Sequence, residues 1–95
     1  MDRRTAKRII AAAGARGHAA VEFSVHALFE AMVDDGVTAC DVFHALAYVE
    51  DVVPQDDGGR KWKAYGPLVS GDRYAVVTVV LDGARVRVVT THEPP

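Results

Sequence analysis

The chain has 95 residues, of which 49% are apolar and 25% are charged, and its formal net charge is −2. These values are normal for one compact domain and leave no room for a second, so we expect a single domain over residues 1–95. The net charge excludes a globally basic nucleic-acid binder, because attraction to phosphate then needs a local patch of positive charge.

No stretch of the chain reaches the roughly 18 apolar residues that a membrane span requires. The start, Met-Asp-Arg-Arg, leads into an amphipathic segment and not into the apolar core of a signal peptide. We therefore expect a cytoplasmic protein that has no membrane contact.

The chain has a single cysteine, Cys40, which excludes an intrachain disulfide and a zinc site built from several cysteines. Thr38 and Asp41 flank it with the spacing of a capping box, so Cys40 is predicted in the first turn of a helix. We interpret it as a buried thiol, and a nucleophile activated by the helix N-terminus is the alternative.

Two helices are expected in the first third of the chain. The first covers residues 2–13, which combine strong helix formers with an apolar stripe, and Gly14 and Gly17 indicate its end. Its basic residues are interpreted as a solvated face, with contact to RNA as the alternative; they are Arg3, Arg4, Lys7 and Arg8. A short strand at 21–23 and an N-cap at Ser24 precede the second helix. The apolar residues of the second helix recur at helical spacing; they are Val25, Leu28, Phe29 and Met32.

The third helix is predicted from about residue 39 to residue 48. Its inward residues are Val42, Phe43, Ala45, Leu46 and Val49. The acidic segment 50–59 should be an exposed connection with at most a short edge strand. Its carboxylates lack the spacing of a calcium loop, and we expect neither a metal ion nor a cofactor.

The chain changes to strand-like alternation after Arg60. Three strands are predicted, over 61–69, 73–81 and 84–91, and the Asp82-Gly83 pair between the last two is a strong hairpin signal. Consecutive hairpins make these strands an antiparallel meander. The predicted fold class is therefore α+β, with three helices packed on one face of a small antiparallel sheet.

Two-residue turns at both hairpins would fix the register of the three strands. A turn at Ser70-Gly71 sets the pairs Lys61–Val80, Lys63–Thr78 and Tyr65–Val76. A turn at Asp82-Gly83 sets the pairs Val80–Arg85, Thr78–Arg87 and Tyr74–Thr91. The face that remains is apolar and suits packing against the helices.

The other face of this predicted sheet collects cations and phenol rings with no acid among them: Lys61, Lys63, Arg85, Arg87, Tyr65 and Tyr74. Thr78 and Thr91 lie between them. Cations neutralise phosphate and phenol rings stack on bases, so single-stranded RNA is the ligand that suits this face best. The alternative is an ordinary solvated face, since any half-exposed sheet needs polar residues there.

One of the four histidines is well placed for acid or base work. His92 follows the last predicted strand, with Arg73 opposite it, and its imidazole suits proton transfer near neutral pH. A solvent-exposed tail histidine is the alternative. His26 and His44 lie on predicted helices and are interpreted as structural or exposed, and His18 lies in a glycine-flanked loop.

Three segments resemble a group of small bacterial proteins: Phe23-Ser24-Val25-His26-Ala27-Leu28, the Gly36-Val37-Thr38 break before Asp41-Val42, and Lys61-Trp62-Lys63-Ala64-Tyr65-Gly66. Together with the order of predicted elements, they are similar to the RelE-like toxins of the motility quorum-sensing regulator type and to a related family of similar length. The resemblance covers about residues 5–92 and implies a single RelE-like α+β domain.

The resemblance also implies a messenger RNA endoribonuclease that needs no metal ion and uses the ribose 2′-hydroxyl as nucleophile. Carried over by position, Lys61 or Arg60 matches a catalytic lysine, Lys63 a glutamine and Tyr74 a tyrosine. His92 falls near the last catalytic lysine of the family. Two positions depart from the toxin pattern: Lys63 replaces a glutamine, and Thr90-Thr91-His92 stands where the toxins have a Ser-Phe-Lys type ending.

The leading hypothesis is thus a type II toxin that cleaves single-stranded or ribosome-bound messenger RNA and is held in check by a cognate antitoxin. The expected catalytic residues are Lys61, Lys63, Tyr74 and His92, and the expected RNA-binding residues are Tyr65, Arg73, Arg85 and Arg87. Two alternatives stay open: a noncatalytic RNA-binding module, and an interaction protein whose exposed sheet edge pairs with a partner strand.

Overall fold

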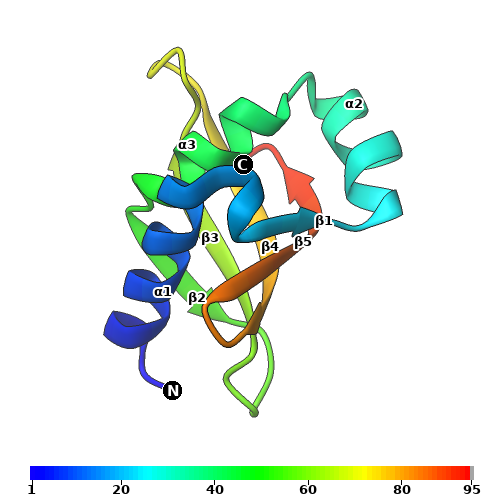
Figure 1. Cartoon of the computed structure of the whole chain (residues 1–95). Coiled ribbons are helices and arrows are strands. Elements are labelled where there is room, and N and C mark those ends of the chain that lie inside the picture. Colours follow the sequence, from blue (N-terminus) through cyan, green and yellow to red (C-terminus); the bar gives the residue numbers. More distant parts are fainter. Residues whose placement is uncertain (95) are drawn as a thin grey trace.

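A five-stranded mixed sheet forms the centre of the structure, a computed structural model that describes residues 1–94 (Figure 1). The strands are β1 (Val21–Phe23), β2 (Asp51–Pro54), β3 (Lys61–Pro67), β4 (Tyr74–Asp82) and β5 (Arg85–His92). Their order across the sheet is β1-β5-β4-β3-β2. β1 runs parallel to β5, and every other neighbouring pair is antiparallel.

The predicted sheet of three C-terminal strands is therefore wrong in both strand number and strand order. β1 joins one edge, where Val21 pairs with Val86, and β2 joins the other, where Val52 pairs with Ala64. The β1–β5 pairing links segments that are more than sixty residues apart in the sequence. Local alternation reveals hairpins, but it carries no signal for a parallel pairing over such a distance.

Two of the three α-helices, α1 (Arg3–Arg16) and α3 (Ala39–Ala47), cover one face of the sheet (Figure 1). Asp2 caps α1 by accepting a hydrogen bond from the Thr5 N–H. Of the two predicted stop signals, Gly17 is the C-cap of α1, whereas Gly14 is wrong as a stop because the helix continues to Arg16. A Cβ atom at Gly14 would collide with Leu46 and the backbone of Ala47, so this glycine permits the close approach of α1 to α3.

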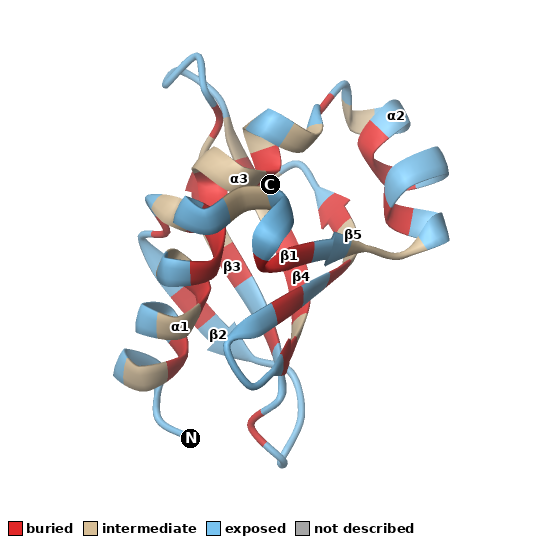
Figure 2. Ribbon diagram, in the orientation of Figure 1, coloured by how far each residue is buried: buried red, intermediate tan, exposed pale blue. Residues whose placement is uncertain are grey.

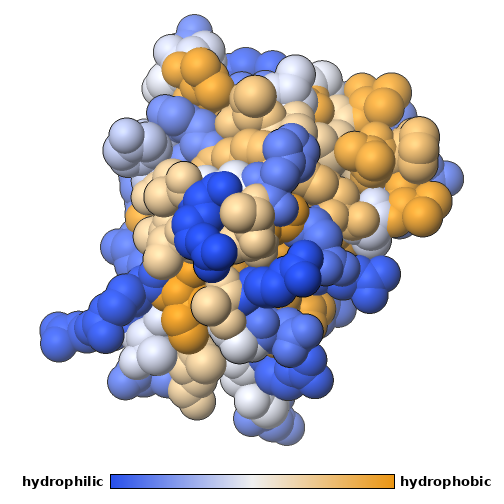
Figure 3. Space-filling view, viewed as in Figure 1, coloured by the Kyte–Doolittle hydropathy of each residue, from blue (hydrophilic) through white to orange (hydrophobic). Residues whose placement is uncertain are grey.

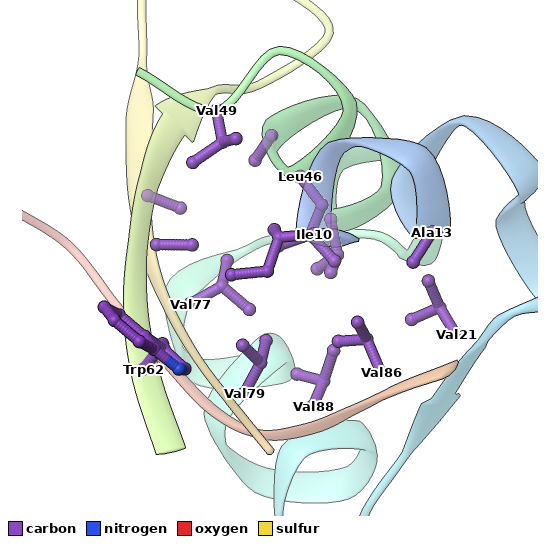
Figure 4. Packing of buried hydrophobic residues seen from close by; sticks show 14 of the residues in the cluster. Ile10, Ala13, Val21, Leu46, Val49, Trp62, Val77, Val79, Val86 and Val88 are labelled. Atoms are coloured by element: carbon purple, nitrogen blue, oxygen red, sulfur yellow. The ribbon is translucent and has the colours of Figure 1, made fainter. Parts of the chain in front are cut away.

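The core lies between these two helices and the inner face of the sheet. Figure 4 shows Ile10 of α1 and Leu46 of α3 turned toward Val77 on β4. Trp62 on β3 is 1% exposed, and its indole N–H donates to the Gly59 carbonyl at 2.8 Å. That hydrogen bond satisfies the one polar atom of the Trp62 side chain and fixes the end of the loop before β3.

The capping box predicted for the third helix is present. The Thr38 hydroxyl accepts from the Asp41 N–H at 3.1 Å, and the Asp41 carboxylate accepts from the Thr38 N–H at 3.1 Å. Cys40 lies in the first turn of α3, as predicted, but the interpretation as a buried thiol is wrong because the side chain is exposed. Position 40 is about 200° around the helix from the buried Val42, so it faces solvent.

The second helical segment follows Ser24 and consists of a π-helical turn, η2 (Ala27–Ala31), and a short helix, α2 (Met32–Asp35). The Ser24 hydroxyl accepts from the Ala27 N–H at 3.0 Å and donates to the Val89 carbonyl at 2.9 Å, which fixes the start of the segment beside β5. Its buried side is formed by Ala27, Ala31 and Met32.

The predicted apolar stripe of this second helix therefore does not face the core. Met32 is buried, but Val25, Leu28 and Phe29 are exposed. Figure 2 shows the exposed residues on the outer side of this segment. A π turn needs more residues than an α turn, which shifts the positions that meet the sheet toward the small alanines.

No helix formed by residues 1–94 combines the length and the apolar character that a membrane crossing requires.

Candidate nucleic-acid interface

The predicted register of β3 and β4 is confirmed. Lys61 pairs with Val80, Lys63 with Thr78 and Tyr65 with Val76. Because side chains alternate along a strand, these residues lie on the face turned away from α1 and α3, which we call the outer face. The residues between them on β3, such as Trp62 and Ala64, are buried on the inner face.

The predicted register of β4 and β5 is wrong. Asp82 pairs with Arg85 and Val80 with Arg87, so the two-residue turn is Gly83-Ala84 and not Asp82-Gly83. Further along, Val79 pairs with Val88 but Thr78 pairs with Thr90, which leaves Val89 as an extra residue in β5. This is a β-bulge, and it changes which later residues of β5 reach the outer face.

Because of the bulge, the last three residues of β5 do not lie where they were predicted. Thr90 and His92 lie on the outer face, where they pair with Thr78 and Val76. Thr91, which was predicted there opposite Tyr74, is instead 1% exposed on the inner side, and its hydroxyl donates to the Asp35 carboxylate at 2.8 Å. The predicted pairs Val80–Arg85, Thr78–Arg87 and Tyr74–Thr91 do not form.

Three rows of side chains thus cross the outer face from β3 to β5. They are Tyr65–Val76–His92, Lys63–Thr78–Thr90 and Lys61–Val80–Arg87. Neighbouring strands are about 4.8 Å apart, and alternate residues of one strand are about 7 Å apart. The lysines of β3 therefore stand roughly 10 Å from the residues of β5 in the same row.

Two phenol rings form the aromatic part of this face. The rings of Tyr65 and Tyr74 are stacked, with 4.8 Å between their centroids and an interplanar angle of 14°. The Tyr74 hydroxyl donates to the Glu50 carboxylate at 2.8 Å. This hydrogen bond, reinforced by the negative charge of Glu50, raises the pKa of the Tyr74 phenol above its ordinary value of 10.0. Tyr74 is thereby held as a neutral stacking group and not as an easily ionised acid.

The cations of the outer face differ in how far they are already neutralised. Arg85 forms an ion pair with Glu22 at 3.2 Å and lies opposite Asp82. Lys61, Lys63 and Arg87 are exposed and form no ion pair with any residue from 1 to 94. None of the residues predicted on this face is an acid, but Glu50, Glu22 and Asp82 lie at its margins, and only its centre carries unopposed positive charge.

Arginines also gather at the edge of the face. Arg60, Arg85 and Arg87 line a cavity of about 190 Å3 together with Glu22 and Asp82. Arg73, by contrast, lies at the other end of β4, outside the three rows. Its guanidinium donates to the Asp35 carbonyl at 3.0 Å and to the Glu93 carboxylate at 3.3 Å. Arg73 therefore lies at the opposite end of β4 from Arg85 and Arg87.

The middle of the face contains an unusual hydroxyl. Thr78 is 4% exposed, and its Oγ1 atom has no hydrogen-bond partner among residues 1–94. It lies between Lys63 and Thr90 in the central row. A buried hydroxyl without a hydrogen-bond partner destabilises the folded state by about 1–3 kcal/mol. A ligand that binds over this row and hydrogen-bonds to Thr78 would therefore gain affinity.

Two histidines lie where β5 meets the second helical segment. His92 pairs with Val76, so its predicted pairing with Arg73 is wrong, although Arg73 hydrogen-bonds Glu93, the residue after His92. His26 and His92 both line a cavity of about 210 Å3, together with the carboxylates of Asp34 and Asp35. His26 was interpreted as structural or exposed, and its position beside the outer face was missed.

His26 is oriented by its neighbours. Its Nδ1 atom lies 2.6 Å from the Glu30 carboxylate, and its Nε2 atom lies 3.3 Å from the Thr90 hydroxyl. The Glu30 carboxylate fixes the imidazole from one side, and a ligand that uses Nε2 must take the place of the longer contact to Thr90. The sequence signal was the spacing of four residues between His26 and Glu30 behind the Ser24 cap. His44 instead contacts the Pro67 carbonyl at 2.9 Å inside the fold.

Comparisons with family models, with curated protein sequences and with solved structures find no match to this chain. Among residues 1–94, no group of three or more histidine, cysteine or acidic side chains is placed to hold a metal ion.

Proposed function

We propose that the outer face binds single-stranded RNA and that the protein is the endoribonuclease toxin of a bacterial toxin–antitoxin system. It would act in the cytoplasm on messenger RNA, free or on the ribosome, and a cognate antitoxin would hold it in check. One observation carries the proposal: the stacked Tyr65 and Tyr74 share the outer face with Lys61, Lys63 and Arg87, three cations that have no carboxylate partner among residues 1–94.

The spacing on this face suits a nucleic-acid strand. Lys61 and Lys63 are about 7 Å apart along β3, and Arg87 faces Lys61 across the width of β4. The three cations can therefore contact successive phosphates or hold one backbone from both sides. An exposed base can stack on the tyrosine pair, and this contact tolerates any sequence because every base has a π face.

Cleavage requires a base, an acid and cations around one phosphate. One histidine takes the proton of the ribose 2′-hydroxyl, and the freed oxygen forms a bond to the adjacent phosphorus. The bond from phosphorus to the 5′ oxygen breaks, and the second histidine gives this oxygen a proton. The products are a 2′,3′-cyclic phosphate and a 5′-hydroxyl, without a metal ion as reactant.

His26 and His92 are the two groups assigned to these proton transfers, since they line one cavity at the end of the outer face. Lys63 lies in the adjacent row and would stabilise the charged phosphorane. Lys61 would hold the neighbouring phosphate. Tyr74, which resemblance places among the catalytic residues, is assigned to stacking because its hydroxyl is bonded to Glu50.

A noncatalytic RNA-binding module is the second candidate. It is favoured by the same Tyr74–Glu50 hydrogen bond, because this bond occupies a hydroxyl that was expected to act in catalysis. Binding would then use the same rows of the outer face without proton transfer.

Incubation of purified protein, free of antitoxin, with end-labelled single-stranded RNA in the presence of EDTA tests both candidates. We expect cleavage that leaves 2′,3′-cyclic phosphate ends, and loss of cleavage in His92→Ala and Lys63→Ala. Binding without cleavage would leave the module, and the absence of both would overturn the proposal. Induction in bacterial cells should arrest growth only if cleavage occurs.

A further inference from the structure

The helical segment 25–35 turns an apolar stripe to solvent. Val25, Phe29 and Val33 recur every four residues and are 76%, 69% and 68% exposed. Figure 3 shows apolar side chains gathered over this segment, at the upper right of the view. Soluble proteins that stay monomeric rarely expose a contiguous apolar patch without a function, so we expect another surface to cover the stripe.

Acidic side chains run beside the stripe. Glu30 and Asp34 each follow a stripe residue by one position, and both are exposed. No lysine or arginine occurs between Gly17 and Gly59. His26 lies 2.6 Å from the Glu30 carboxylate and Arg73 hydrogen-bonds the Asp35 carbonyl, but Asp34 forms no ion pair with any residue from 1 to 94. The surface that complements it is therefore an apolar hollow bounded by cations.

The chain itself carries such a hollow. A cavity of about 220 Å3 lies between α1 and the β4–β5 turn, lined by Arg8, Ile9, Ala12, Ala13, Arg16 and Ala84. Apart from its two arginines, every lining residue is alanine or isoleucine. Arg8 and Arg16 form no ion pair with any residue in the described range 1–94. A cavity of roughly 150 Å3 already holds benzene, so the hollow has room for a phenyl ring.

We propose that the stripe docks on this cavity in a second copy of the chain. Phe29 of one copy fills the cavity of the other, and Asp34 pairs with Arg8 or Arg16. Figure 1 shows from one side both α2, which carries part of the stripe, and α1, which lines the cavity, and Figure 3 shows apolar side chains over α2 in the same view. A two-fold axis midway between them would bring each area onto its counterpart, which gives a closed dimer.

This association does not require RNA and is tested without it. Analytical ultracentrifugation of the full chain, from micromolar to millimolar concentration, should show a dimer that dissociates on dilution. Phe29→Asp should weaken association by about 30-fold or more, as loss of a central aromatic contact does. Val69→Asp, at a valine that is 58% exposed outside both areas, should leave it unchanged.

A mixing experiment separates docking from a general loss of structure. Phe29→Asp keeps an intact cavity, and the double variant Arg8→Glu with Arg16→Glu keeps an intact stripe. Each should be monomeric alone, with an unchanged circular dichroism spectrum, and their mixture should form a 1:1 complex. A monomeric wild-type protein, an undiminished mass for Phe29→Asp, or a mixture that stays monomeric would each overturn the proposal.

Discussion

The phenol rings of Tyr65 and Tyr74 lie nearly parallel, 4.8 Å apart between centroids, although the two residues belong to different strands. Tyr74 is fixed further by its hydrogen bond to Glu50. A base that stacks on this pair should contribute about 1–3 kcal/mol to binding. Tyr65→Ala should therefore weaken the binding of single-stranded RNA by roughly 5- to 150-fold in fluorescence anisotropy.

The matched control for this stacking prediction is Tyr74→Phe, which keeps the ring and removes only the hydroxyl. Its RNA affinity should stay close to that of the wild type, because the hydroxyl is engaged by Glu50 and not by the ligand. Equal losses in Tyr65→Ala and Tyr74→Phe would indicate that hydroxyl contacts, and not stacking, hold the bases.

Lys61, Lys63 and Arg87, which form no ion pair among the described residues, should dominate the salt dependence of binding. Lys63→Ala should reduce the slope of log K against log salt concentration by about 0.7 if one phosphate contact is lost. Arg85→Ala should have a smaller effect, because Glu22 already neutralises this arginine. Arg4→Ala on α1 should have none, and a loss there equal to that of Lys63→Ala would move the binding site to α1.

The role assigned to His26 predicts a change in the cleavage rate without a change in the affinity for RNA. His26→Ala should lower the cleavage rate by about 10²–10⁴-fold and leave the affinity for uncleaved RNA nearly unchanged, as expected for a proton-transfer group. Glu30→Gln should lower the rate less, since it weakens the orientation of the ring and not the ring itself. His18→Ala is the control, because His18 packs on Phe43 away from the outer face. Single-turnover kinetics measure both quantities, and unchanged rates in His26→Ala would refute its role.

The capping box of α3 gives a stability prediction that depends on pH. Partial burial acts to raise the pKa of the Asp41 carboxyl, but hydrogen bonds from the Thr38 N–H, the Val69 N–H and the Thr38 hydroxyl outweigh it and hold the pKa below 3.8. The folded state therefore gains stability from Asp41 above the unfolded pKa, and this gain is lost as pH falls through the lower folded pKa.

Removing the cap should reduce this contribution. Thr38→Ala should lower the free energy of unfolding by about 1 kcal/mol near neutral pH, and the difference from wild type should shrink below about pH 3.8. Asp41→Asn has no carboxyl to protonate at this position, so the loss of stability that protonation of Asp41 causes at low pH should be absent in this variant. Urea unfolding at a series of pH values measures these differences, and a Thr38→Ala effect that stays constant down to pH 2 would exclude the coupling to Asp41.

The sequence was informative where the signal is local. Alternation along β3 and β4 placed Lys63 on the outer face, because a one-residue slip would bury a lysine, and the turn assumed at Ser70-Gly71 paired it with Thr78. The capping box at Thr38 was equally readable. The bulge at Val89 was not, since a valine is compatible with either face and the bulge is fixed by a hydrogen bond from Ser24, far away in the sequence.

The candidate site was predictable to the same extent. The lysines and tyrosines of β3 and β4 were placed on one face by alternation alone. His26 could not be placed there, because its approach to Thr90 depends on the parallel pairing of β1 with β5 and on the helical segment that follows it. Thr91 was placed on the wrong face because the register assumed for β5 lacked the extra residue, and His92 was placed opposite Arg73 because the turn was also set one residue too early.

Titration of the isotope-labelled protein with a short single-stranded RNA, followed by NMR, tests the central claim most directly. We expect the largest chemical-shift changes along the outer face, at Lys61, Lys63, Tyr65 and Arg87 and at the neighbouring amide of Thr78. Shifts confined to the basic surface of α1, or no shifts at RNA concentrations that saturate known single-strand binders, would contradict RNA binding by the outer face.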